Sequence, residues 1–247
     1  ILFVGLGKMG FHMAGYLSKN KKFKLFVFNR TKSVELKWKK KFIAESYNFK
    51  NDIKFDFIIS CLKDDNAVNT FFNKFVKTSN FHKNSIIIDH STISLKQIDL
   101  LSSSFKQRKI KFIDAPITGG EEGAKKGSLS VMVGGTKLNF NKSKRIISSY
   151  SKSITHMGKL GSGQLTKFTN QILICGILYS ISEAYLFSKK NNLDQKKIFN
   201  AIKNGAANSW QFTNRYPTLT KNKFNFGFST ELMTCLLYTS PSPRDTN

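Results

Sequence analysis

Cysteine, proline and histidine are all scarce in this chain of 247 residues. The three cysteines, Cys61, Cys175 and Cys235, lie far apart and form no Cys-x-x-Cys pair. This spacing excludes a disulfide framework and a cysteine zinc site, and it favours a reducing, cytoplasmic location. The four histidines are scattered without ligand spacing, so we expect no metal. With only four prolines and 40% hydrophobic residues, the composition is typical of a globular chain rather than a disordered one.

Long uncharged stretches are also missing. The longest one, residues 168–182, is only 15 residues long and contains polar side chains such as Asn170 and Gln171. A transmembrane helix needs about 20 predominantly apolar residues. We therefore expect no membrane span.

Acidic residues are few, 15 against 40 lysines and arginines, which leaves a formal net charge of +25. Such a charge ordinarily raises the expectation of a nucleic-acid partner. The excess is nearly all lysine, however, and it is spread from end to end without an arginine-rich segment that could contact bases. Because lysine is encoded by A/T-rich codons, we interpret the charge mainly as genome bias and expect no nucleic-acid partner.

Short apolar runs alternate with helical patterns over the first two thirds of the chain. The expected strands are 1–4, 24–28, 56–60, 85–89, 110–114, 128–133 and 153–156. The expected helices between them are a stretch from 10 to 19 and the segments 32–41, 65–77, 95–107 and 138–149. This alternation predicts an α/β fold, a doubly wound parallel sheet of the Rossmann type, over residues 1–157.

The pattern changes at residue 158, where a glycine-rich joint precedes one long expected helix, 164–189, and a shorter one, 194–203. Asp194 is placed to cap the shorter helix. We predict an all-helical second domain over 158–234. Residues 235–247 hold two of the four prolines and resemble a translated sequencing adapter, so we expect this tail to be non-native.

The motif Gly5-x-Gly7-x-x-Gly10 follows a predicted strand and opens a predicted helix. In this context Gly5 permits a tight turn, Gly7 lets a pyrophosphate approach the backbone, and Gly10 lets the helix pack closely on the strand. The loop, with Leu6, Lys8 and Met9 between the glycines, is therefore predicted to bind a dinucleotide.

The end of the second predicted strand, about 20 residues further on, bears on the choice of cofactor. An acidic residue there would favour NAD, but this chain has Asn29, Arg30 and Thr31. A guanidinium beside an uncharged amide and a hydroxyl suits a 2′-phosphate, because arginine can hold phosphate oxygens by paired hydrogen bonds. NADP(H) is predicted over NAD(H).

Four ordered motifs carry a family resemblance. They are Gly5-Leu-Gly-Lys-Met-Gly10, Asp89-His-Ser-Thr-Ile93, Asp114-Ala-Pro-Ile-Thr-Gly-Gly120 and Gly161-Ser-Gly-Gln-Leu-Thr-Lys-Phe-Thr-Asn170. Together they resemble the β-hydroxyacid dehydrogenase family, over residues 1 to about 234. The resemblance implies hydride transfer between the cofactor and a small 3-hydroxy acid or its semialdehyde, as in 3-hydroxyisobutyrate dehydrogenases. It also implies a carboxylate substrate and a homodimer or homotetramer for the full-length protein.

The resemblance further implies roles for individual residues. Lys167 matches the family's catalytic lysine, and Asn170 matches the first of its two adjacent asparagines. The residues expected to bind substrate are Ser91, Thr118, Gly119 and Gly120, and those expected to border the cofactor are Cys61, Leu62, Lys63 and Thr92. There are departures: Gln171 replaces the second asparagine, Thr118 replaces the usual serine, and the segment that follows Met233 in the family is absent.

Helical spacing supports the role of Lys167 on its own. Lys167, Asn170 and Gln171 are three and four residues apart, so they share one face of the predicted long helix. An ammonium on a mostly apolar helix is expected to have a lowered pKa, as a general acid near neutrality requires. His90, by contrast, has no acid in a triad-like arrangement, and we expect it to cap a turn.

Two other functions stay open. One is a tartronate semialdehyde, glyoxylate or succinic semialdehyde reductase, which the motifs do not separate from a 3-hydroxyisobutyrate dehydrogenase. The other is a catalytically silent dinucleotide-binding module, against which Lys167 argues. If the helical domain is cut short, we expect apolar surface to be exposed along 164–189.

Overall fold

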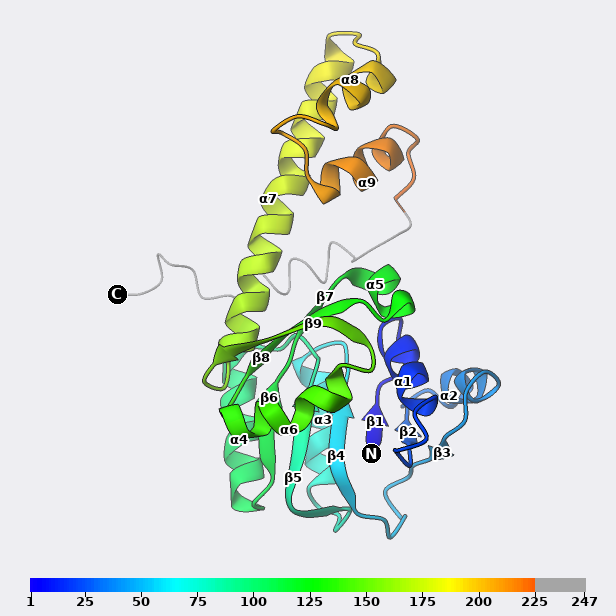
Figure 1. Ribbon diagram of the computed structural model, residues 1–247, viewed down its shortest axis with the longest axis vertical. Helices are drawn as coiled ribbons and strands as arrows, with labels where there is room; N and C mark the ends of the chain where they lie inside the picture. Colours follow the sequence, from blue (N-terminus) through cyan, green and yellow to red (C-terminus); the bar gives the residue numbers. More distant parts are fainter. Residues whose placement is uncertain (225–247) are drawn as a thin grey trace. The chain divides into compact units, whose positions relative to one another are not determined.

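The computed structural model describes residues 1–224 (Figure 1). These residues form two compact units, 1–167 and 168–224. The first unit is an α/β sandwich, and the second is helical. The predicted tail, 235–247, and the end of the predicted helical domain lie outside the described residues.

The elements of the first unit alternate as the sequence predicts. Its strands are β1 (Leu2–Val4), β2 (Phe26–Phe28), β3 (Glu45–Ser46), β4 (Phe55–Ser60), β5 (Phe81–Asp89), β6 (Lys111–Asp114), β7 (Ile117–Thr118), β8 (Leu129–Gly134) and β9 (Ser151–Gly158). Its helices are α1 (Gly10–Ser18), α2 (Lys32–Lys39), α3 (Asp65–Phe75), α4 (Leu95–Gln107), α5 (Gly120–Lys126) and α6 (Lys137–Ile147). The short elements β3, β7 and α5 were not predicted.

The strands form one sheet in the order β3-β2-β1-β4-β5-β6-β8-β7, with β9 paired to β8. From β3 to β6 all neighbours are parallel, which confirms the doubly wound fold. The expectation of a wholly parallel sheet is wrong at its far end, where β8 runs antiparallel to β6 and to β7. The connection from β7 to β8, residues 119–128, is shorter than the dozen or so residues that a parallel crossover needs.

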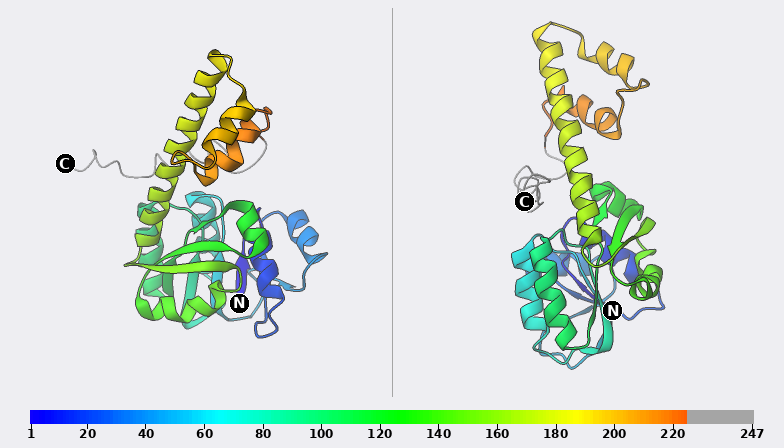
Figure 2. Two further views of the ribbon diagram at one scale, coloured as in Figure 1. Left: turned by 45° about the horizontal axis from the view of Figure 1, so that its top comes forward. Right: turned by 90° about the vertical axis from the view of Figure 1, so that its left-hand side faces the viewer.

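Helices cover both faces of this sheet (Figure 2, right). Alternate residues of β1 point to opposite faces: Phe3 packs into a core with α1, α2, α5 and α6, while Leu2 and Val4 pack into a core with α3 and α4. Burial on both faces explains why the central strands are continuous apolar runs. The two cores hold the carboxyl ends of the parallel strands at one edge, where the predicted site residues follow.

The helix α7 (Ser162–Lys190) crosses the boundary between the two units, and α8 (Gln195–Ile202) and α9 (Trp210–Leu219) belong to the second. Ile181, Phe212 and Tyr216 form a small core there. Asp194 accepts hydrogen bonds from the backbone of Lys196 and Lys197, so its predicted capping role is confirmed. The helix α9 was not predicted.

Along α7, large apolar side chains are exposed among the described residues, including Leu173 and Phe187. By length and composition alone the helix could cross a membrane, because an 18-residue stretch within it has a mean hydropathy of 1.3. The sequence predicts no membrane span because the uncharged run 168–182 is too short. The helix, however, begins and ends well beyond that run. The absence of a membrane span therefore stays a prediction.

Candidate active site

The predicted cofactor residues follow the carboxyl ends of neighbouring parallel strands. Gly5 follows β1, Asn29 follows β2, Cys61 follows β4, and the loop 90–93 follows β5. In open α/β sheets this edge is where ligands bind, and the crevice lies where the strand order reverses. Here the order reverses at β1 and β4, so the glycine-rich loop and Cys61 lie at that point.

The structure explains the glycine at each of the three positions of the loop differently. Gly5 has a φ of 95°, which L side chains rarely adopt, and a Cβ there would overlap the Cys61 carbonyl oxygen. A Cβ on Gly10 would overlap the Gly5 carbonyl oxygen, so Gly10 lets α1 start against the strand. A Cβ on Gly7 would meet nothing within 4 Å. The fold itself therefore does not need Gly7, and the open space above it is the kind that a ligand fills.

Backbone donors are available at the same place. The N–H groups of Gly7, Lys8 and Met9 donate to no other residue in the described part of the chain. They precede α1, whose N-terminus carries a partial positive charge. Free N–H groups with room above them fit the pyrophosphate of a nicotinamide dinucleotide.

Asn29 has a second role that sequence reasoning missed. Its Oδ1 accepts a 2.9 Å hydrogen bond from the Leu6 N–H, and its Nδ2 donates to the Thr31 carbonyl oxygen at 2.9 Å. The side chain therefore ties the glycine-rich loop to the end of β2. Arg30 is exposed beside it, so its guanidinium is placed to meet solvent or a phosphate.

The loops after β4 and β5 are joined through Ser91. Its Oγ accepts a 2.9 Å hydrogen bond from the Leu62 N–H, and its own N–H donates to Asp89 Oδ1 at 3.0 Å. Ser60 Oγ donates to the same Asp89 oxygen at 2.8 Å. Ser91 is buried and engaged in this network, whereas its neighbour Thr92 is half-buried and Lys63 is exposed.

Burial shifts the acid–base behaviour of this network. It raises the pKa of Asp89 to about 6, against the lowering effect of its hydrogen bonds from Ser91 and Ser60. It also raises the pKa of the Cys61 thiol to about 12, so Cys61 stays a neutral thiol near neutral pH. Asp89 Oδ2 makes no hydrogen bond to another described residue.

The expectation that His90 caps a turn is wrong. Its ring is buried, with Nδ1 2.6 Å from the Ala115 carbonyl oxygen and Nε2 2.8 Å from the Tyr150 hydroxyl. Burial lowers the pKa of His90 to about 4. His90 is thus a neutral core residue that links β5, β6 and the end of α6.

The segment Thr118-Gly119-Gly120 runs from the last residue of β7 to the first residue of α5, with Thr118 half-buried and both glycines exposed. Gly119 and Gly120 have φ angles of 125° and 62°, in the region that favours glycine. A Cβ on Gly120 would meet nothing within 4 Å. The segment is therefore open to an approaching ligand, as a carboxylate-binding segment must be.

Lys167 lies in the second turn of α7 and is half-buried. Desolvation lowers the pKa of its ammonium to about 8. Further along the helix, Asn170 Nδ2 donates to Gln171 Oε1 at 2.9 Å. The expected depression of the lysine pKa is thus present, and Lys167 is set to exchange a proton near neutral pH.

Two residues that sequence reasoning left without a role, Asp114 and Gln164, join the start of α7 to this edge of the sheet. Asp114, at the end of β6, accepts hydrogen bonds from the backbone of Gly161 and Gln164. Gln164 in turn bonds to the backbone of Ser91 and Ile93. The signal for both was the ordered motif that contains them, but partners about 50 and 70 residues away have no local sequence pattern.

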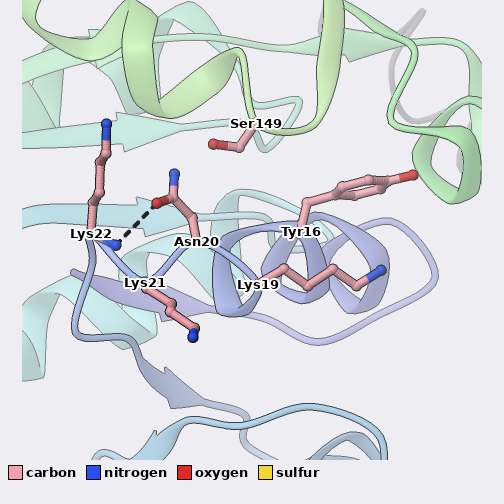
Figure 3. A pocket seen from close by; sticks show the side chains of 6 residues that line it. All are labelled: Tyr16, Lys19, Asn20, Lys21, Lys22 and Ser149. Carbon is pink, nitrogen blue, oxygen red and sulfur yellow. Dashed lines mark hydrogen bonds between the residues drawn. The ribbon is translucent and has the colours of Figure 1, made fainter.

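A hollow elsewhere on the first unit contains none of the predicted site residues. It is lined by Tyr16, Lys19, Asn20, Lys21, Lys22 and Ser149 (Figure 3). The Lys22 N–H donates to Asn20 Oδ1 at 3.1 Å, while the three lysine side chains point away from one another. They do not converge on a common ligand position, so we place the site at the glycine-rich edge. In residues 1–224, no three His, Cys, Asp or Glu side chains gather as metal ligands would.

Comparisons with known proteins show the family of this chain. Residues 1–158 match the family described as the NAD binding domain of 6-phosphogluconate dehydrogenase. Residues 161–235 match the family described as NAD-binding of NADP-dependent 3-hydroxyisobutyrate dehydrogenase. An uncharacterized oxidoreductase of Shewanella frigidimarina is 35% identical over 236 residues, which cover 94% of this chain and 81% of that protein. The chain belongs to the β-hydroxyacid dehydrogenase family.

Two further relatives carry more specific names. The mitochondrial 3-hydroxyisobutyrate dehydrogenase of Drosophila melanogaster is 32% identical over 84% of this chain and 64% of its own length. The solved structure of Mycobacterium tuberculosis 3-hydroxyisobutyrate dehydrogenase with L-serine has a TM-score of 0.85, at 23% identity over 96% of this chain and 84% of that one. The predicted family, the Rossmann-type fold with a helical C-terminal domain, and an NAD(P)-dependent oxidoreductase activity are confirmed.

Proposed function

We propose that this β-hydroxyacid dehydrogenase transfers a hydride between NADP(H) and a small 3-hydroxy acid or its semialdehyde, with Lys167 as the proton donor and acceptor. The observation that carries the proposal is the half-buried ammonium of Lys167, whose pKa desolvation lowers to about 8. A lysine with its ordinary pKa would release a proton far less readily at neutral pH. Lys167 is close to the balance that general acid–base catalysis needs.

Lys167 and Asn170 have separate roles in the proposed reaction. When bound, the nicotinamide supplies the hydride acceptor or donor. In the reductive direction, the Lys167 ammonium gives its proton to the oxygen of the substrate carbonyl as negative charge develops there. In the oxidative direction, the neutral Lys167 amine takes the proton of the substrate hydroxyl. Asn170, on the same face of α7, orients the substrate oxygen toward Lys167.

Two exposed segments receive the ligands. The N–H groups of the glycine-rich loop hold the cofactor pyrophosphate, and Arg30 holds the 2′-phosphate that distinguishes NADP from NAD. Thr118, Gly119 and Gly120 hold the substrate carboxylate. L-serine, with which the Mycobacterium tuberculosis relative was solved, is itself a small 3-hydroxy acid, which supports this substrate class.

The proposed domains are 1–157 for the cofactor and 158–234 for the helical domain, with a homodimer or homotetramer in the cytoplasm. Within the family, 3-hydroxyisobutyrate is our first candidate substrate. Tartronate semialdehyde, glyoxylate and succinic semialdehyde are the alternatives, because the same carboxylate and carbonyl groups would meet the same residues.

The test is a substrate panel. Oxidation of NADPH and NADH is followed at 340 nm with methylmalonate semialdehyde, tartronate semialdehyde, glyoxylate and succinic semialdehyde. We expect turnover with at least one of them and a higher kcat/KM with NADPH than with NADH. Retained NADPH binding without turnover on any member of the panel would contradict the proposal and favour a silent dinucleotide-binding module.

A further inference from the structure

Asp114 is a buried carboxylate that caps a helix from a distance. It ends β6 and is fully buried. Its Oδ1 accepts a 2.7 Å hydrogen bond from the Gly161 N–H, and its Oδ2 accepts a 2.8 Å hydrogen bond from the Gln164 N–H. The first N–H groups of an α-helix have no partner within the helix. Asp114 therefore supplies, from 47 residues earlier, the acceptors that the start of α7 lacks.

Two glycines make room for this carboxylate. A Cβ on Gly134, which pairs with Asp114 across the sheet, would overlap Asp114 Oδ1. A Cβ on Gly163 would lie 2.6 Å from Asp114 Oδ2 and would also overlap the Met132 carbonyl oxygen. The backbones of β8 and α7 thus close on Asp114 from two sides. So close a fit allows little sideways movement of the first turn of α7.

Gln164 fixes the first turn of α7 to the loop that follows β5. Its side chain is fully buried, its Nε2 donates to the Ser91 carbonyl oxygen at 2.8 Å, and its Oε1 accepts from the Ile93 N–H at 3.3 Å. Both partners lie in the loop after β5. One side chain thus uses both ends of its amide to join α7 to that loop, on either side of Thr92.

Lys167 lies three residues after Gln164, about 4.5 Å further along the helix axis and on a neighbouring part of the same face. Asp114 sets where α7 begins, and Gln164 sets how the helix is rotated against the loop 91–93. From these contacts we infer that Asp114 and Gln164 are positioning residues, which hold the Lys167 ammonium in register with the loop that borders the nicotinamide and substrate. The inference rests on the proposed role of Lys167.

Kinetics of three variants test it. Asp114→Asn replaces one acceptor oxygen by a donor group that faces a backbone N–H, and Gln164→Met removes both bonds to the loop at similar volume. We expect either variant to lower kcat at least tenfold while the Kd for NADPH stays within twofold, because the glycine-rich loop is untouched. Asp194→Asn is the matched control, because Asp194 also accepts two backbone N–H groups at a helix start but lies in the second unit.

The control separates positioning from general loss of stability. Asp194→Asn is expected to lower the melting temperature and leave kcat unchanged. If Asp114→Asn does not fold, Gln164→Met alone decides the matter. Wild-type kcat in both folded variants, or in Gln164→Met alone when Asp114→Asn does not fold, would overturn the inference.

A parallel Lys167→Met variant distinguishes this inference from the proposed function. Full activity in Lys167→Met would refute the role of Lys167 itself. Loss of activity in Lys167→Met, together with wild-type kcat in Asp114→Asn and Gln164→Met, would refute only the positioning role. The pH profile of kcat supplies a further readout. Burial lowers the pKa of Lys167 to about 8, so a displaced and better solvated Lys167 should titrate at a higher pH than in the wild type.

Discussion

The N–H of Leu6 donates a 2.9 Å hydrogen bond to Oδ1 of Asn29, across 23 residues of sequence. Leu6 belongs to the loop proposed to hold the cofactor phosphates, and Asn29 follows β2, at the position proposed to discriminate between NADP and NAD. The same Asn29 side chain donates to the Thr31 carbonyl oxygen. The Asn29 amide therefore holds the glycine-rich loop in place, besides avoiding a negative charge near a phosphate. The side chain of Arg30 is exposed and is available for a 2′-phosphate.

Replacing Arg30 should test the cofactor preference. Arg30→Gln removes the charged donors for the 2′-phosphate and leaves the Leu6–Asn29 bond in place. Since hydrogen bonds to charged groups contribute about 1.5–3 kcal/mol, we expect the KM for NADPH to rise about 10- to 100-fold, with little change for NADH. Lys37→Gln, an exposed change of the same charge on α2, is the control. An equal effect on NADPH and NADH would assign Arg30 no part in the discrimination.

Gly7→Ala and Gly10→Ala should affect different properties, cofactor binding in the first case and stability in the second. A Cβ on Gly10 would overlap the Gly5 carbonyl oxygen, whereas a Cβ on Gly7 would meet no protein atom within 4 Å. We expect Gly10→Ala to lower the melting temperature by several degrees. Gly7→Ala should melt close to the wild type but bind NADPH at least tenfold more weakly, as judged by fluorescence titration. Unchanged NADPH binding in Gly7→Ala would mean that the space above this glycine is not the phosphate position.

The adjacent buried residues Asp89 and His90 should have opposite effects on stability between about pH 4 and 6.5. Burial raises the pKa of Asp89 from 3.8 to about 6, so its contribution to stability is full at low pH and is lost as the pH rises through about 6. Burial lowers the pKa of His90 from 6.5 to about 4, so its contribution is full above pH 6.5 and is lost as the pH falls toward 4. In the wild type the two slopes largely offset each other.

Single variants should expose each slope in urea denaturation at a series of pH values. Asp89→Asn removes the first effect, so its unfolding free energy should rise relative to wild type by about 3 kcal/mol between pH 4 and 7, at about 1.4 kcal/mol for each pKa unit. His90→Asn should show the reverse trend relative to wild type. Parallel curves for wild type and both variants would show that neither group titrates with a shifted pKa.

Much of the fold was readable from local pattern. The expected helix from Leu95 to Gln107 has the predicted bounds, because Ser94 caps it and apolar residues recur at helical spacing. The glycine-rich loop was equally clear, because a Cβ on Gly5 or Gly10 would overlap a nearby carbonyl oxygen, while Gly7 leaves open space for a ligand. Three elements were missed for local reasons: β7 has only two residues, α5 has a single apolar side chain besides its two glycines, and α9 contains Pro217, which is unfavourable inside a helix.

The contacts that shape the candidate site were less readable. Gln164 was visible only as a residue near the start of a helix, yet its side chain binds a loop more than 70 residues earlier. His90 looked like a turn residue because it follows a strand, while its partners, Ala115 and Tyr150, come from elements that only the fold brings together. Sequence pattern reports on neighbours along the chain, and these bonds depend on neighbours in space.

The central claim is that Lys167 transfers the proton. The most direct measurement is the kcat for NADPH-dependent reduction of the best semialdehyde, from pH 6 to 10, in the wild type and in Lys167→Met, with NADPH binding measured alongside. Because burial lowers the pKa of Lys167 to about 8 and the ammonium is the donor, wild-type kcat should fall as the pH rises above about 8. Lys167→Met should bind NADPH normally and lose about 10²- to 10⁴-fold in kcat, without a break near pH 8. Wild-type turnover and the same pH profile in Lys167→Met would contradict the account.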